Sequence, residues 1–187
     1  MLAALGVALQ GYWAQGRMNR SATEVFVSKD VVADILPPPM YLIETRLVLS
    51  QAVEGTMQAE DAQRQFRRLK GEYEGRVKHW LANPPYGLEQ HLLGPQHEAA
   101  QRFLTVAEDK IIQPLLAGDR EQARRNLPDV QLIYQAHRTG VDRTVQEGNR
   151  FAEASMASFE AVHVLSLKVA IAMALLAVAL VVLVYLL

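Results

Sequence analysis

Three consecutive prolines followed by polar side chains form the first stretch of this sequence that could bind a ligand. The stretch contains Pro37, Pro38, Pro39, Tyr41, Glu44 and Arg46. A proline lacks a backbone donor and forces the residue before it away from the helical region, so one helix must end before the cluster and another must begin after it. Carbonyl groups freed near Ile35 and Leu36 could then help to form a cavity for a small polar molecule. A plain kink between two halves of a long helix is the alternative, and the residues alone leave both open.

A second polar cluster lies in the last third of the sequence. It consists of Tyr134, His137, Arg138 and Asp142. Their spacing of i, i+3, i+4 and i+8 predicts that they share one side of a helix. If this side faces the first cluster, Arg46 or Arg138 could clamp a carboxylate through two parallel hydrogen bonds. Tyr41 and Tyr134 could then supply an aromatic wall and a hydroxyl. The alternative is a polar layer that fixes the register of a helical bundle.

Other kinds of site lack the residues that they need. The sequence has no cysteine, which excludes disulfides, thiolate zinc sites and cysteine nucleophiles. Its five histidines include only one Glu-x-x-His pair, Glu160 with His163, whereas a di-iron bundle needs two. We find no pairing of a nucleophile with a base and no glycine-rich phosphate loop, so we predict no catalytic residue, metal or cofactor. A formal net charge of −1 also argues against nucleic acid as a partner.

The strongest signal for a structural element is the uncharged run at residues 169–187. As a helix it would be roughly 28 Å long, close to the thickness of the hydrocarbon layer of a membrane. Lys168 can extend to one interface, and Tyr185 suits the aromatic belt at the other. A buried helix of a soluble protein is the alternative, but such helices seldom stay apolar on every face for so long. We therefore predict a transmembrane helix at residues 165–187.

The first residues of the sequence are also apolar, but the run ends near Trp13 and is too short to cross a membrane. It lacks the basic start of a secretory signal. We expect the outer half of a first transmembrane helix at residues 1–16, with a weak uncleaved anchor as the alternative. Gly11, Tyr12 and Trp13 would then mark the outer interface.

Between these ends, the spacing of apolar residues predicts long helices. One stripe in the segment 58–82 comprises Ala62, Phe66, Leu69, Tyr73, Val77 and Trp80. A helix beginning at Pro95 carries Ala100, Phe103, Ala107 and Ile111 on one stripe, and Pro114 should kink its last turn. Gly118 should end that helix, and Asp119 is a suitable N-cap for the next one.

The last helix should run almost without interruption from Asp119 into the membrane. Its seam, spaced mostly by three and four, comprises Leu127, Val130, Tyr134, His137, Val141, Val145, Gly148, Ala152, Ser155, Phe159, Val162 and Ser166. The sequence therefore predicts an all-α protein: an up-down four-helix bundle with long antiparallel helices, the last of which continues into the transmembrane helix. We assign the bundle to residues 17–164.

Two stretches resemble a known family. They are KDVVADILPPPMYLIETRL at 29–47 and LLAGDREQARRNLPDVQLIYQAHRTGVDRTVQ at 115–146. They resemble the periplasmic four-helix-bundle sensor region of bacterial methyl-accepting chemotaxis proteins, over essentially the whole chain. The resemblance implies a homodimer in the bacterial inner membrane, with the bundle in the periplasm binding an amino acid, an organic acid or an anion. Such receptors continue into a HAMP linker and a signalling coiled coil, so we expect a fragment of a longer receptor or a truncated product.

A protein of another class stays open beside this interpretation. A structural or adaptor coiled-coil protein, anchored by residues 169–187 and without a small ligand, would have the same helical pattern. The proline cluster and the polar residues from Tyr134 to Asp142 favour the sensor. The two predictions differ in whether a small molecule stabilises the folded protein.

Overall fold

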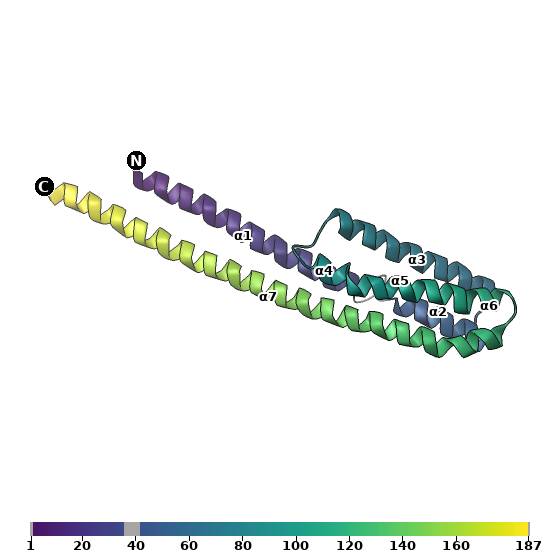
Figure 1. Cartoon of the computed structure of the whole chain (residues 1–187). Helices are drawn as coiled ribbons and strands as arrows, with labels where there is room; N and C mark the ends of the chain where they lie inside the picture. Colours follow the sequence, from purple (N-terminus) through teal and green to yellow (C-terminus); the bar gives the residue numbers. More distant parts are fainter. Residues whose placement is uncertain (1, 36–41, 187) are drawn as a thin grey trace. The chain divides into compact units, whose positions relative to one another are not determined.

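The computed structural model describes residues 2–35 and 42–186, and every element assigned within these ranges is a helix (Figure 1). The all-α prediction is therefore confirmed. The helices are α1 (Leu2–Ile35), α2 (Ile43–Glu54), α3 (Ala59–Ala82), α4 (Glu89–Leu92), α5 (Pro95–Ala107), the π-helical turn η1 (Glu108–Ile112), α6 (Gln113–Leu116) and α7 (Arg120–Leu186).

The contacts within the chain divide it into two compact units. The core unit is Ser28–Asn149, and the two-helix unit combines Met1–Val27 with Arg150–Leu187. These units describe packing. The predicted boundaries after residues 16 and 164 describe membrane borders instead, and they stay a prediction.

The core unit buries the apolar stripes that the sequence predicted. All six residues of the α3 stripe are buried, as are Ala100, Phe103, Ala107 and Ile111 of the segment that begins at Pro95. Segments α2 and α3 lie side by side, and η1 contacts both (Figure 1). The first part of α7 contributes Val130, Tyr134 and Val141 to the buried side chains. Burial of these stripes is the main force that holds the unit together.

Most helix ends lie where the sequence predicts them. Helix α1 ends at Ile35, before the proline cluster, and α2 begins at Ile43, directly after Leu42, which is in the left-handed conformation with φ 55°. Pro37, Pro38 and Pro39 lie outside the described residues. Asp119 caps α7 as predicted, since its Oδ1 accepts the backbone N–H of Gln122 at 2.8 Å.

Pro114 changes the helix before it in a way that the sequence analysis did not predict. The chain from Pro95 to Leu116 stays helical, but Glu108–Ile112 form a π-helical turn. Proline has no N–H for the carbonyl four residues earlier, and its ring collides with that carbonyl in a regular α-helix. The carbonyl concerned is that of Lys110, and it accepts Asn126 Nδ2 of α7 at 3.0 Å instead. The predicted kink is thus a wider turn whose free carbonyl is used by a neighbouring helix.

Helix α7 is continuous over 67 residues, and Pro128 near its start does not end it. Its predicted seam is confirmed at Val130, Tyr134, His137 and Val141, and at several positions beyond them. At one position a neighbour takes the place of the predicted residue: Thr144 is fully buried, whereas Val145 is only partly buried. A polar residue holds this buried position because its hydroxyl has a partner on α5, as described below. Leu127, Phe159 and Ser166 of the seam are also only partly buried.

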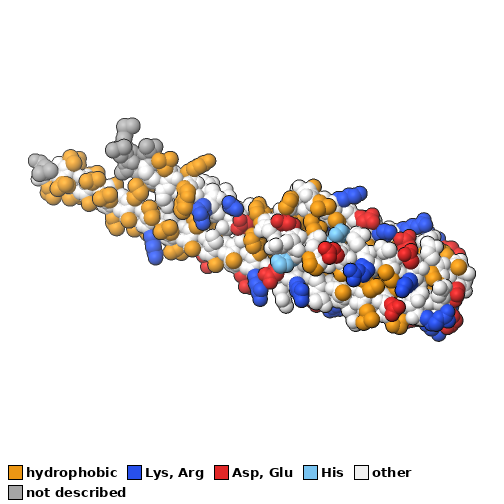
Figure 2. All heavy atoms as spheres, viewed as in Figure 1, with side chains coloured by type: hydrophobic (Ala, Val, Ile, Leu, Met, Phe, Trp, Pro, Cys, Tyr) orange, Lys and Arg blue, Asp and Glu red, His pale blue; other side chains and the backbone are white. Residues whose placement is uncertain are grey.

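Among the described residues, α7 is the one helix that is long and apolar enough to cross a membrane, judged by length and composition. Most of its apolar side chains beyond Leu167 are exposed, and Figure 2 shows apolar side chains covering the C-terminal part of the helix on the visible face. Such a surface is unfavourable in water but suits a lipid environment. One possible transmembrane segment is therefore supported at the predicted place.

In the two-helix unit, α1 and α7 approach closely through small side chains. Ala14 and Ser21 of α1 are buried, as are Ala152 and Ser155 of α7. The hydroxyl of Ser155 donates to Glu24 Oε2 at 3.1 Å. Nearer the N-terminus, a Cβ added to Gly6 would lie 3.2 Å from Met173 Cε. The two segments therefore run antiparallel, so that the N-terminal part of α1 lies along the apolar end of α7.

Candidate functional site

A buried polar layer connects the start of α5 with α7 inside the core unit. Gln96, at the start of α5, is almost completely buried, and so are His137 and Thr144 of α7. The backbone carbonyl of Gln96 lies 3.1 Å from His137 Nδ1, which must carry a proton because a carbonyl only accepts. The side-chain Oε1 of Gln96 accepts the Thr144 hydroxyl at 2.6 Å. His137 and Thr144 of α7 thus form hydrogen bonds with the backbone and the side chain of the same glutamine.

Gly140 allows this close approach. It lies between His137 and Thr144 on the buried side of α7, and a Cβ at this position would be 2.8 Å from the Cα of Gln96. Backbone atoms cannot move aside as the end of a flexible side chain can. A side chain at residue 140 would therefore separate α5 from α7 and stretch both hydrogen bonds.

Arg46 of α2 forms a second polar contact with α7. Its Nε donates to Gln131 Oε1 at 2.6 Å, and its Nη1 donates to the hydroxyl of Ser50. Burial lowers the pKa of Arg46, and this is partly opposed by the nearby Tyr134 and Glu54. An arginine stays charged despite such a shift, since its ordinary pKa is far above neutral. Arg46 therefore places a half-buried positive charge beside α7.

Tyr134 lies between these two polar groups. It is buried, and its ring centroid lies 5.5 Å from that of Phe103 and 6.5 Å from that of His137. Arg46 bonds to Gln131, which lies three residues before Tyr134 on α7. The structure thus brings together three of the seven predicted ligand-binding residues: Arg46, Tyr134 and His137.

The other predicted residues lie elsewhere. Tyr41 is outside the described residues, as are the three prolines. Glu44 pairs with Arg68 of α3 at 2.8 Å on the surface. Arg138 and Asp142 are exposed, at the solvent edge of the side of α7 that carries Tyr134 and His137. Successive residues turn by about 100°, and only Tyr134 and His137 lie on the buried seam. Whether the seven residues bind a ligand stays a prediction.

A cluster that joins the end of α1 to α3 was not predicted from the sequence. Asp34 Oδ2 accepts a hydrogen bond from Trp80 Nε1 at 2.9 Å and forms an ion pair with Arg76. The Arg76 guanidinium also lies over the Trp80 ring, 5.6 Å from its centroid. One signal was present in the sequence. A carboxylate in the last turn of a helix is unfavourable with respect to the helix dipole, so Asp34 needs a compensating partner.

Tyr73 and His97 form another contact that the sequence did not indicate. The rings are stacked with centroids 5.8 Å apart, and the Tyr73 hydroxyl lies 2.7 Å from His97 Nδ1. Burial raises the pKa of Tyr73, so its hydroxyl keeps its proton and donates. Burial lowers the pKa of His97, opposed in part by Glu98, so the neutral ring is favoured and Nδ1 accepts.

This contact predicts a pH dependence of stability. Because the pKa of His97 is lower in the folded than in the unfolded protein, the unfolded chain binds its proton first as the pH falls. Stability contributed by the neutral ring is complete above the unfolded value of about 6.5 and is lost as the pH falls through the lower folded value. Thermal melting from pH 8 to pH 5 should therefore show a decline that is smaller in His97→Gln. An equal decline in both proteins would contradict the assignment.

Thr144→Val should destabilise the protein by about 1–2 kcal/mol, because it leaves Gln96 Oε1 buried without a donor. The two side chains have nearly the same shape, so packing changes little. Urea unfolding of the detergent-solubilised chain measures the effect. Thr139→Val is the matched control, since Thr139 is exposed on the same helix and its hydroxyl bonds only to the Gln135 carbonyl. An equal effect of the two substitutions would argue against the polar layer.

Comparisons with models of known protein families, with curated proteins and with solved structures gave no match. The chemistry of the described residues is therefore the basis for any function. Among those residues, no group of three or more histidine and acidic side chains is placed to hold a metal ion. The arrangement offers a half-buried guanidinium, a buried tyrosine and a buried histidine at the contacts of α7 with α2 and α5.

Proposed function

We propose that this chain is the sensor module of a transmembrane receptor of the chemotaxis type. In this proposal the core unit is an up-down four-helix bundle that lies in the periplasm of a bacterium and binds a small amino acid, organic acid or inorganic anion. Binding shifts α7 along or about its axis, and α7 carries that shift into the membrane. The receptor works as a homodimer, as the sequence resemblance implies.

The observation that carries the proposal is the position of Arg46 against α7. A half-buried guanidinium held by Gln131 and Ser50 offers donors to a carboxylate or another anion, and its partners are neutral. A ligand that takes the place of Gln131 would change a contact between α2 and α7. A ligand shifts an equilibrium only through its different affinities for the two arrangements, and this contact provides such a difference.

Continuity of α7 supports the second part of the proposal. The same helix carries Gln131 and His137 in the core unit and the exposed apolar residues beyond Leu167. No loop interrupts it among the described residues, and in this proposal a displacement at Gln131 is passed along the helix. A helix with all its backbone hydrogen bonds formed is stiff enough for this role.

One observation favours the adaptor without a ligand. Gln96 bonds to His137 and Thr144, and Arg46 bonds to Gln131 and Ser50, all within the chain. Polar contacts of this kind can fix the register of neighbouring helices without any ligand. The two proposals differ in their response to small anions.

Thermal unfolding of the full chain in mild detergent, with a panel of amino acids, organic acids and inorganic anions, tests the sensor. A ligand at about 100 times its dissociation constant should stabilise the folded state by roughly 2.7 kcal/mol. Arg46→Gln should weaken the affinity for that ligand about tenfold or more, through loss of a charge-assisted hydrogen bond. Arg67→Gln is the matched control, because Arg67 is exposed on α3. A flat panel on a folded protein would favour the adaptor.

A further inference from the structure

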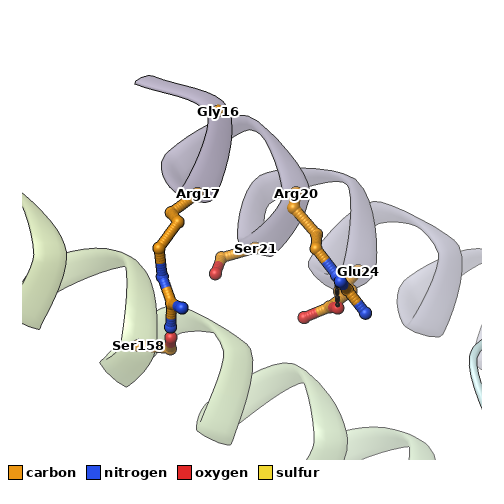
Figure 3. A pocket seen from close by; sticks show the side chains of 6 residues that line it. All are labelled: Gly16, Arg17, Arg20, Ser21, Glu24 and Ser158. Carbon is orange, nitrogen blue, oxygen red and sulfur yellow. Dashed lines mark hydrogen bonds and ion pairs between the residues drawn. The ribbon is translucent and has the colours of Figure 1, made fainter. Parts of the chain in front are cut away.

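The two-helix unit contains a polar hollow that plays no part in the proposed ligand sensing. It has a volume of about 300 Å³ and is lined by Gly16, Arg17, Arg20, Ser21, Glu24 and Ser158. Figure 3 shows Arg17 extending from α1 toward Ser158 of α7, with the Ser21 side chain between the two helices. Gly16 contributes no side chain, which leaves this part of the wall open. Two arginines and two hydroxyls thus surround one space.

The two arginines differ in their partners. Arg20 Nε is bonded to Glu24 Oε1 at 3.1 Å, and the other carboxylate oxygen of Glu24 accepts the Ser155 hydroxyl at 3.1 Å. Glu24 is the acidic residue of the lining, and both of its oxygens accept a hydrogen bond, one from Arg20 (Figure 3) and the other from Ser155. Arg17 has no carboxylate partner among the described residues, and its one contact is with the Trp13 ring, 5.5 Å from the guanidinium carbon. The hollow therefore carries one uncompensated positive charge.

The position of the hollow relates it to the apolar surface of α7. The exposed side chains of Val164 and Leu165 precede that surface, and Ser158 lies about 9 Å before Val164 along the helix axis. A headgroup layer is roughly 5–8 Å thick on each side of a bilayer. The Arg17 guanidinium lies closer to the membrane than Ser158 does, because the side chain extends over Trp13 toward the N-terminal end of α1. Tyr12 and Trp13 are well exposed at this level, as aromatic residues at a membrane interface are.

We propose that this hollow binds a phosphate group through Arg17, with Ser21 and Ser158 as additional donors. A guanidinium presents two parallel N–H groups to two phosphate oxygens, and a hydroxyl can donate to a third. The headgroup of an anionic phospholipid is one source of such a group, and a soluble phosphate is the other. At this site, α1 and α7 would bind the same phosphate close to the membrane. It does not depend on ligand binding by Arg46.

Native mass spectrometry of the full chain in detergent, with equal amounts of phosphatidylglycerol and phosphatidylcholine of the same acyl chains, tests the lipid source. The protein should retain phosphatidylglycerol preferentially, and Arg17→Gln should reduce this retention about tenfold. Arg17→Lys should retain an intermediate amount of phosphatidylglycerol, because lysine keeps the positive charge but lacks the two parallel N–H groups of a guanidinium. Arg143→Gln, which removes an exposed charge from α7 in the core unit, should change nothing.

Thermal unfolding with inorganic phosphate tests the soluble source on the same proteins. Stabilisation by phosphate that Arg17→Gln abolishes, together with unchanged retention of lipid, would assign the site to a soluble phosphate. Equal lipid retention and equal phosphate response in the wild type and Arg17→Gln would overturn the proposal. Circular dichroism checks that the variant is as helical as the wild type, which we expect because Arg17 is exposed. Ligand responses that depend on Arg46 are measured separately, so either proposal can fail alone.

Discussion

Gly140→Ala should destabilise the protein by about 2–3 kcal/mol, at the upper end of the usual cost of overpacking. The new Cβ would lie 2.8 Å from the Cα of Gln96 and 2.9 Å from its Cβ. The first of these atoms is backbone, so relief requires α5 and α7 to move apart. That movement weakens the hydrogen bonds from His137 and Thr144 to Gln96, which adds to the steric cost.

The same substitution at Gly71 provides a control of opposite sign. Gly71 lies within α3, and a Cβ there would meet nothing within 4 Å. Alanine should therefore stabilise the protein by about 0.5–1 kcal/mol, because it lowers the entropy of the unfolded chain and suits a helix. Urea unfolding followed by circular dichroism in mild detergent compares the two variants. Similar effects at residues 71 and 140 would show that α5 and α7 are not in close contact at Gln96.

Asp34→Ala should also destabilise the protein, by about 2–3 kcal/mol, because it removes the acceptor of two donors at once. Arg76 and the indole N–H of Trp80 both bond to Asp34 Oδ2. Arg76 Nε is already buried without a hydrogen-bond partner among the described residues. Loss of the carboxylate would leave a partly buried guanidinium with no counter-charge from this cluster, and the end of α1 would lose its attachment to α3.

Asp30→Ala is the matched control for this cluster. Asp30 lies one turn earlier on α1 and is exposed, so its removal should change stability by no more than about 0.5 kcal/mol. Trp80→Phe separates the contribution of the Trp80 hydrogen bond from that of the Arg76 ion pair, since it keeps an aromatic ring but loses the hydrogen bond to Asp34. Fluorescence is unsuitable for that variant, and circular dichroism serves for all three. Equal effects of Asp34→Ala and Asp30→Ala would contradict the role assigned to the carboxylate.

Local patterns in the sequence were sufficient for the helices and for most of their buried faces. The six-residue stripe of α3 and the cap at Asp119 depend on spacing and on the residue type at one position, and both are confirmed. Such features are decided within a few residues of chain. The apolar end of α7 could also be predicted from a local stretch of sequence, since its composition alone indicates a possible transmembrane helix.

Pairings between distant residues could not be obtained in this way. Periodicity placed Val145 on the seam of α7, but Thr144 is buried instead because Gln96, far away in the sequence, accepts its hydroxyl. Arg138 could clamp a carboxylate if its side of α7 faced the first cluster, yet it is exposed, and spacing along one helix does not show which residues of another helix lie opposite it. Asp34 was overlooked for the same reason, because its partners lie on another helix.

The turn before Pro114 has a consequence for the order in which the protein folds. Elsewhere in a helix, a carbonyl is satisfied by its own helix as soon as one more turn forms. Lys110 cannot be satisfied by Pro114, and its carbonyl accepts Asn126 of α7 instead. When α7 docks, this end of the α5–α6 segment therefore gains a hydrogen bond that its own helix cannot supply. One proline thus makes a helix end depend on a contact with a segment that comes later in the chain.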